Sequence, residues 1–219
     1  MTLITRLAPL AVLLATGCND VEVPAGCHLH GDELHCDDNH GLATTVVLTF
    51  TPTAGGEALT FTWSDPEDDG DPLVVDIVLP DGSDDDQHEA RAYTLGIEVL
   101  NELEDPTEDV TVEIADQAEV HQFFFTGSAV VGPASDSPNA VISQAYADAD
   151  ENGLPLGLEN TIETVDRGSG ELTITLRHMP AEDGSPVKTA DLAEQVASDG
   201  FGDIGGGNDI DVDFNIEVE

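Results

Sequence analysis

The segment of residues 209–218 restricts the fold of this chain more than any other feature. Five apolar side chains alternate there with acidic or amide side chains: Ile210, Val212, Phe214, Ile216 and Val218 against Asp209, Asp211, Asp213, Asn215 and Glu217. Successive side chains of a β-strand point to opposite faces, so this alternation predicts a strand with one apolar and one acidic face. Such a strand is typical of an antiparallel sheet that is covered on one side and solvated on the other.

Shorter alternations of the same kind precede it, and clusters of Asp, Gly and Pro separate them as turns separate strands. The expected strands cover residues 43–51, 58–64, 72–79, 91–101, 121–131, 140–148, 170–177 and 209–218. One helix is expected from Asp105, with Pro106 at its first position, to about Val120, and a shorter one over residues 189–198. We therefore expect a mainly β fold, an antiparallel β-sandwich of about eight strands with Ig-like or Greek-key connections and one or two short helices.

The N-terminus has the pattern of a removable export signal. Arg6 is followed by an apolar run that is too short to span a bilayer, and small residues lead to Cys18. The end of this run, Ala-Thr-Gly-Cys, resembles the lipobox of bacterial lipoproteins, in which the Cys carries the lipid. An ordinary secretory signal with a chance Cys is the alternative. We expect a signal peptide over residues 1–17, a lipidated tether over 18–41 and an acidic sandwich domain over 42–219.

The acidic excess limits which partners the chain can bind. It contains 46 Asp and Glu against five Lys and Arg. Nucleic-acid binding depends on Lys and Arg neutralising phosphates, so we expect no nucleic-acid partner. The same charge attracts cations, although solubility or adaptation to salt explains it equally well.

A short loop contains both remaining cysteines. Residues 27–36 read CHLHGDELHC, which places Cys27 and Cys36 at the two ends. Outside the cytoplasm such a pair is expected to be oxidised. A disulfide here would close a ring of ten residues and remove roughly 2.5–3 kcal/mol of unfolded-state entropy on the loop-closure model.

The same loop concentrates histidine. His28, His30 and His35 lie inside the ring and His40 lies just beyond it. Neutral imidazoles suit Zn²⁺, Cu²⁺ and Ni²⁺, so the loop predicts a transition-metal site, with zinc favoured over copper. Reduced thiols would instead make a mixed Cys/His zinc site, and an inert stapled tether is the third possibility. The motif resembles short Cys/His segments in the extracellular parts of zinc-transporting and zinc-scavenging proteins.

One of the acidic loops has the spacing of a calcium loop. Asp148, Asp150 and Asn152 stand at alternate positions before a glycine, and Glu159 follows. Oxygen ligands at this spacing can converge on one hard cation. The flanking segments read as strands rather than as EF-hand helices, and Asp, Asn and Gly also build turns that bind no ion.

No catalytic motif is present. The chain lacks a nucleophile elbow, a phosphate loop and a dinucleotide fingerprint, and its carboxylates are too numerous for any pair to be informative. His121 and His178 each stand at the edge of an expected strand, where a single histidine is usually packed or solvent-facing. We expect no enzymatic activity.

Several short segments together resemble a known family: residues 44–50, 100–102, 121–124, 150–158, 176–178 and 209–218. They are similar to small surface lipoproteins of Gram-negative bacteria that are often labelled type 1 periplasmic-binding-fold proteins. The resemblance implies a lipoprotein that accompanies an outer-membrane uptake receptor and has no established reaction. The label itself implies an α/β fold, whereas the residues of this chain predict a mainly β one.

We therefore expect an exported protein, lipid-anchored to the outer membrane on its periplasmic or cell-surface face, that binds a divalent transition metal through the His loop. Zinc is the favoured metal, and a role beside a metal-uptake receptor follows from the resemblance. The alternative is a structural or adhesive surface sandwich whose Asp-rich loops bind calcium or no ion.

Overall fold

The computed structural model describes residues 43–66, 70, 72–83, 88–179 and 187–219, together with the backbone of residues 27–30 and 33–36. The chain divides into two units, residues 1–39 and 40–219. In the first unit β1 (Cys27–His30) and β2 (Glu33–Cys36) form an antiparallel ladder. Cys18 and the expected signal peptide lie outside the described residues. Within the described part, neither helix has the length and hydrophobicity needed to cross a bilayer.

The second unit is built mainly of strands. Its elements are β3 (Thr45–Pro52), β4 (Leu59–Ser64), β5 (Leu73–Val74), β6 (Ile77–Leu79), β7 (Ala92–Asn101), β8 (Glu108–Asp109), α1 (Val110–Asp116), β9 (His121–Thr126), β10 (Val130–Gly132), β11 (Ser135–Asp136), β12 (Ile142–Tyr146), β13 (Glu159–Thr164), β14 (Gly168–His178), α2 (Leu192–Asp199) and β15 (Gly207–Val218).

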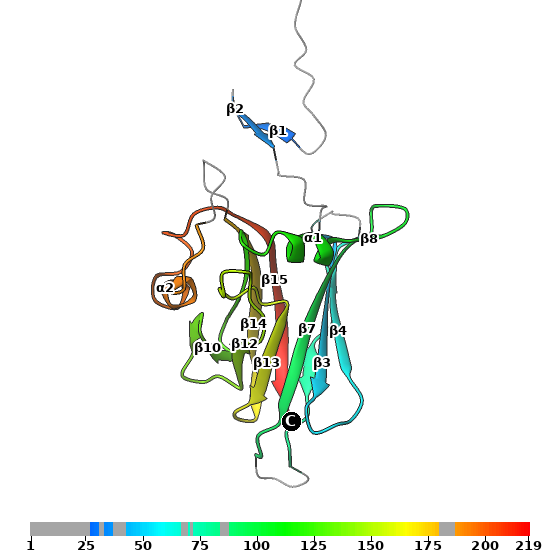
Figure 1. The fold of residues 1–219 in the computed structure, drawn as a ribbon. Helices are drawn as coiled ribbons and strands as arrows, with labels where there is room; N and C mark the ends of the chain where they lie inside the picture. Colours follow the sequence, from blue (N-terminus) through cyan, green and yellow to red (C-terminus); the bar gives the residue numbers. More distant parts are fainter. Residues whose placement is uncertain are drawn as a thin grey trace, which may run out of the picture. The chain divides into compact units, whose positions relative to one another are not determined.

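These strands form two sheets (Figure 1). The larger has the order β11-β10-β12-β13-β7-β3-β4-β5, with β8 paired to β7, and the smaller has the order β6-β15-β14-β9. The pairs β10–β12 and β6–β15 are parallel, and the other pairs are antiparallel. Buried apolar side chains from both sheets form one core, so the expectation of a mainly β sandwich is confirmed.

The C-terminal alternation behaves as predicted. Its five apolar side chains are all at most 4% exposed: Ile210, Val212, Phe214, Ile216 and Val218. Strand β15 pairs along almost its whole length with β14, and β14 pairs with β9. The acidic face of β15 therefore lies on the outer side of the smaller sheet, opposite the core.

Two segments predicted as single strands cross between the sheets instead. Residues 72–79 divide into β5, which ends the larger sheet, and β6, which ends the smaller. Residues 121–131 divide into β9 in the smaller sheet and β10 in the larger. The second break occurs at Gly127, whose φ is 106° and where a Cβ would lie 2.3 Å from the carbonyl oxygen of Glu171. Only glycine fits this turn.

Strand β13 was not predicted, because its buried positions are polar. Asn160 and Thr164 are fully buried on either side of Ile162. Asn160 accepts a hydrogen bond from Gln144 Nε2 at 2.8 Å, and its own Nδ2 donates to the Gly157 carbonyl at 2.7 Å. Thr164 Oγ1 accepts the Arg91 backbone N–H at 2.9 Å. Hydrogen-bonded polar side chains thus stand at the positions where an alternating pattern would have apolar ones.

Helix α1 begins later than predicted. Its N-cap is Asp109, whose side chain accepts from the backbone N–H of Thr111, and Val110 and Ile114 are buried at helical spacing. The preceding residues Glu108 and Asp109 pair with β7 as the short strand β8. Tertiary pairing therefore outweighs the capping signal at Asp105 and Pro106. Helix α2 agrees with the expected second helix to within a few residues.

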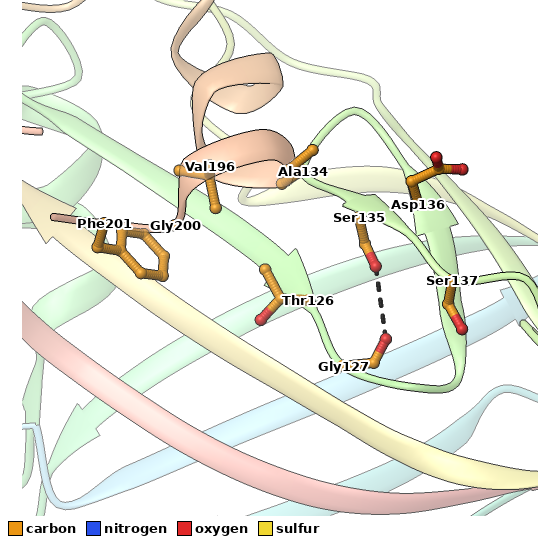
Figure 2. Close-up of a pocket in the computed structure, with 10 residues that line it drawn as sticks. Thr126, Gly127, Ala134, Ser135, Asp136, Ser137, Val196, Gly200 and Phe201 are labelled. Atoms are coloured by element: carbon orange, nitrogen blue, oxygen red, sulfur yellow. Dashed lines mark hydrogen bonds between the residues drawn. The ribbon is translucent and has the colours of Figure 1, made fainter. Parts of the chain in front are cut away.

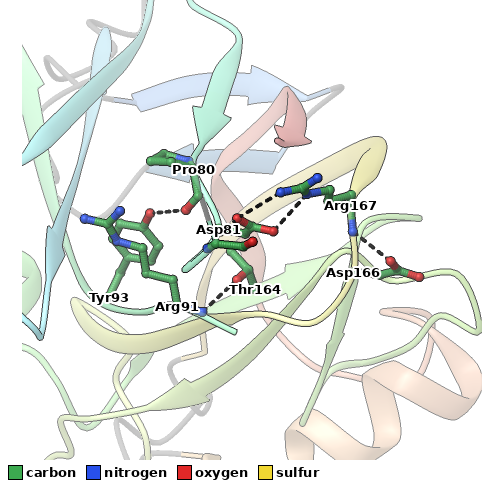
Figure 3. Close-up of polar contacts among 8 residues, drawn as sticks. Pro80, Asp81, Arg91, Tyr93, Thr164, Asp166 and Arg167 are labelled. Carbon is green, nitrogen blue, oxygen red and sulfur yellow. Dashed lines mark hydrogen bonds and ion pairs between the residues drawn. The ribbon is translucent and has the colours of Figure 1, made fainter. Parts of the chain in front are cut away.

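Two arginines of the sandwich make internal contacts, and that of Arg167 with Asp81 joins distant segments of the chain (Figure 3). Arg167 Nε lies 2.9 Å from Asp81 Oδ2, and its Nη2 is 3.4 Å from Oδ1 of the same carboxylate. These hydrogen bonds lower the pKa of Asp81 to about 2. The guanidinium of Arg91 lies 5.5 Å over the centre of the Tyr93 ring. In a chain with so few basic residues, both are used for internal contacts.

Candidate metal centre

The predicted His loop is described at the level of its backbone. The β1–β2 ladder pairs Cys27 with Cys36 and His28 with His35, and it places His30 opposite Glu33. Directly opposed residues in an antiparallel ladder have Cα atoms about 4.5–5.5 Å apart, a range that a disulfide can bridge. His40 lies outside the described residues.

The predicted calcium loop is internally satisfied. Asp148 accepts the backbone N–H of Gly157 at 2.7 Å and that of Glu159 at 3.0 Å. Asp150 Oδ1 accepts the N–H groups of Asn152 and Leu154, both at 2.9 Å. These bonds build the turn itself, as carboxylates in Asx turns do.

Lys188 contacts the second carboxylate oxygen of Asp150. Its Nζ lies 2.9 Å from Asp150 Oδ2, and neither side chain is exposed to solvent. It also donates to the Ala118 carbonyl at 2.8 Å. Burial alone would raise the pKa of Asp150, but the backbone N–H of Leu154 and the ammonium of Lys188 outweigh it and lower the pKa. Calcium binding by Asp148, Asp150, Asn152 and Glu159 remains a prediction, and it requires that Lys188 be displaced.

Three other residues form the group best suited to hold a metal ion. They are His121, His178 and Asp209, and the candidate ligand atoms of the three all lie within 4.8 Å of one another. Within the described residues this is the one such group of His, Cys, Asp or Glu side chains. It lies at one end of the smaller sheet, where three adjacent strands each contribute one residue.

Strand register brings the two histidines together. Antiparallel pairing of β9 with β14 places His121 directly opposite His178. Their rings are stacked, with centroids 4.6 Å apart and planes 19° from parallel. His121 is fully buried and His178 half-buried, so the pair faces solvent only through His178.

A β-bulge places the carboxylate of Asp209 near His121. The β14–β15 register shifts between Leu176 and Arg177, so that Leu176 pairs with Ile210 but Arg177 pairs with Asn208. Asp209 is the extra residue, and bulges of this kind re-aim a side chain. Its side chain is 27% exposed, and its Oδ2 lies 3.3 Å from His121 Nε2.

A close backbone approach holds β15 against His178. Gly206, with a φ of 86°, precedes the strand, and a Cβ there would lie 1.8 Å from the His178 carbonyl oxygen. Any other residue would push β15 away from the histidines, so this glycine is required for the observed spacing.

A backbone carbonyl orients the His121 ring. His121 Nδ1 lies 3.0 Å from the Gln117 carbonyl oxygen, which can only accept a hydrogen bond. The proton must therefore be on Nδ1, and Nε2 faces Asp209. Metal-ligating histidines are commonly oriented in this way, with the second ring nitrogen bonded to a carbonyl or carboxylate.

The sequence did not predict this group. In the sequence His121 and His178 are isolated histidines at strand edges, and Asp209 is one of many acids on the solvent face of its strand. The available signal was that each histidine stands at the edge of a predicted strand, but it becomes informative only when the two strands are known to be neighbours.

A separate pocket of about 420 Å³ lies between α2 and the turn from β9 to β11 (Figure 2). Val196 and Phe201 form its apolar wall, and Thr126, Ser135 and Asp136 form its polar side. Ser135 Oγ lies 3.4 Å from the Gly127 carbonyl. None of the three grouped residues lines this pocket.

No family model, curated protein or solved structure matches this chain, so the chemistry of the site has to be inferred from its own residues.

Proposed function

We propose that this protein binds a divalent transition metal through His121, His178 and Asp209. The observation that carries the proposal is the 3.3 Å separation of His121 Nε2 and Asp209 Oδ2. Two ligand atoms at Zn–N and Zn–O distances of about 2.0–2.1 Å are about 3.3–3.4 Å apart when the coordination is tetrahedral. A charge-assisted hydrogen bond between the same atoms would be shorter, about 2.7–2.9 Å. The separation is therefore one that two ligands of a single tetrahedral ion would have.

The third ligand needs a small movement. The two imidazoles are stacked, so they cannot both direct a nitrogen at the same ion from their present positions. We propose that the ring of His178, the more exposed of the two, turns to direct a nitrogen at the ion, while the Gln117 carbonyl holds His121 in place. Three protein ligands leave one position for water, as in exchangeable zinc sites.

The ligand types and the charge of the chain support the same metal class. Two imidazoles and one carboxylate suit Zn²⁺, Co²⁺, Ni²⁺ and Cu²⁺ better than they suit calcium, which prefers oxygen. The formal net charge of −41 raises the local concentration of any cation near the surface.

The test is a Co²⁺ titration of the full chain, followed by competition with Zn²⁺. The background is the oxidised chain with His28, His30 and His35 changed to Ala, which removes the imidazoles of the N-terminal loop. We expect His178→Asn and Asp209→Asn to lower the affinity by about 100-fold or more, since even outer-shell partners are typically worth 10–100-fold.

Glu217→Gln is the matched control for this titration, because Glu217 is an exposed acid on the same strand, at the opposite end from the bulge. It should bind Co²⁺ as the background chain does. Equal affinity of His178→Asn, Asp209→Asn and the control would overturn the proposal.

We also propose that the N-terminal His loop captures the same class of metal and that a lipid on Cys18 holds the protein at the outer membrane. The register that sets His28 opposite His35 and Cys27 opposite Cys36 supports metal capture by the loop, and the Ala-Thr-Gly-Cys motif supports the lipid anchor. Restoring the three loop histidines to the Asp209→Asn chain should restore part of the metal binding. If it restores none, the loop is only a tether.

The competing proposal is a structural or adhesive surface sandwich that binds calcium or no ion. It predicts a rise in melting temperature with Ca²⁺ that is lost in Asp148→Ala. The present hydrogen bonds of Asp148 to Gly157 and Glu159 make that loop a turn that is stable without an ion.

A further inference from the structure

Strands β14 and β15 are joined by an excursion that starts after His178 and returns just before Asp209. Both residues are proposed ligands. The path of the chain into β15 therefore determines whether Asp209 lies close to His178. The excursion contains α2 and packs on the outside of β9 through a small separate core: Phe124, Ala134, Met179, Leu192, Ala193, Val196 and Ile204. Nothing in this core belongs to the proposed ligand set.

One side chain binds the returning strand. The guanidinium of Arg177 donates to the Ile204 carbonyl at 2.6 Å, to the Gly205 carbonyl at 3.2 Å and to Asn208 Oδ1 at 2.7 Å. It also lies 5.7 Å over the ring of Phe201. Four contacts from one planar group hold the returning chain beside the end of β14.

These contacts coincide with the bulge. Arg177 is the residue at which the register shifts, and Asn208, its hydrogen-bond partner, is also its Cα partner. Without the shift, regular pairing would set Asp209 opposite Arg177 instead of leaving it as the extra residue. We infer that Arg177 is a positioning residue for the metal centre, because it sets the bulge that holds Asp209 near His121. The inference rests on the proposed function.

The chemistry of the side chain favours arginine over lysine here. A guanidinium offers several donors in a fixed plane, so it can bond two carbonyls and an amide oxygen at once and still lie over an aromatic ring. Burial lowers the pKa of Arg177, but from a value so high that the group stays charged. A lysine would keep the charge and lose most of the fixed geometry.

The consequence is a preorganised ligand. With Arg177 in place, Asp209 already has its bound position in the free protein. Without it, the bulge can relax or move, and the apparent affinity falls in proportion to the fraction of chains that keep the geometry. Outer-shell partners of metal ligands are typically worth about 10–100-fold in affinity, and we expect a loss in this range for Arg177→Gln.

The experiment compares Arg177→Gln and Arg177→Lys with Arg91→Gln, in the full chain with His28, His30 and His35 changed to Ala. Arg91 is a matched control, because it also lies over an aromatic ring, at 5.5 Å from Tyr93, but does not contact β15. Co²⁺ affinity, the Co²⁺ absorption spectrum and the melting temperature of the metal-free chain are measured for each. We expect Arg177→Gln to weaken Co²⁺ binding about 10–100-fold and to change the absorption spectrum. Arg177→Lys should weaken Co²⁺ binding less than Arg177→Gln does. Arg91→Gln should leave the Co²⁺ affinity and the spectrum unchanged.

Asn208→Ala is the second variant, in case Arg177→Gln does not fold. It removes one exposed partner of the guanidinium and should lower the affinity several-fold with the fold intact. If the parent binds Co²⁺ through Asp209 while Arg177→Lys and Asn208→Ala bind it equally well with the same spectrum, Arg177 has only a structural role. If the parent shows no binding that depends on His178 and Asp209, the proposed function itself has failed.

Discussion

The buried pair of Lys188 and Asp150 should be among the most important polar contacts for stability. Their charged atoms are 2.9 Å apart and both side chains are fully buried. Coulomb's law gives about 6 kcal/mol for unit charges at that distance and an effective dielectric constant of about 20, although desolvation offsets most of this. Removing one partner leaves an uncompensated charge, which typically costs about 3–5 kcal/mol. We therefore expect Lys188→Met to lose about 3–5 kcal/mol of unfolding free energy.

The assay is equilibrium urea unfolding at pH 7 of the parent, Lys188→Met, Asp150→Asn and the double variant. The double variant removes the unpaired buried charge of Asp150, and the amide oxygen of the new Asn can still accept the N–H groups of Asn152 and Leu154. It should recover about half or more of the loss, leaving mainly the cost of the bond to Ala118, about 1 kcal/mol. A Lys188→Met chain within about 0.5 kcal/mol of the parent, the range usual for surface substitutions, would refute the reasoning. So would a double variant no more stable than the single one.

Two further predictions concern the sandwich. The Asp81 carboxyl, followed by NMR, should titrate near pH 2, and Arg167→Gln should raise its pKa towards the ordinary value. Because the pKa is lowered in the folded state, the stabilisation by this pair is present above about pH 4 and is lost as the pH falls towards 2. An unchanged Asp81 titration in Arg167→Gln would contradict this prediction. Gly127→Ala should lower the urea midpoint markedly, because its Cβ would lie 2.3 Å from the Glu171 carbonyl at a φ of 106°. Gly153 also has a positive φ but lies in open space, so Gly153→Ala should lower the midpoint less.

Local pattern was sufficient wherever one face of a strand is apolar. The alternation from Ile210 to Val218 predicted β15 and its buried face, and Val110 and Ile114 predicted a helix. These features depend on side chains a few residues apart, so the sequence alone contains the information. The acidic excess likewise follows from composition, and the expectation of no nucleic-acid partner rests on that composition alone.

Three features were decided only by tertiary structure. Strand β13 was missed because Asn160 and Thr164 are buried with their hydrogen bonds satisfied, and no local pattern distinguishes such a residue from an exposed one. The break at Gly127 depends on the approach of Glu171, a residue in another strand.

The candidate metal centre is the third feature. His121, His178 and Asp209 come from three strands that are distant in sequence, and two facts unite them: the register of β9 on β14 and the bulge between β14 and β15. The sequence predicted that these strands exist and, for β15, which face is buried. Only the assembled sheet determined which residues become neighbours, because strand order and register are set by packing between segments far apart in the chain rather than by the residues within any one strand.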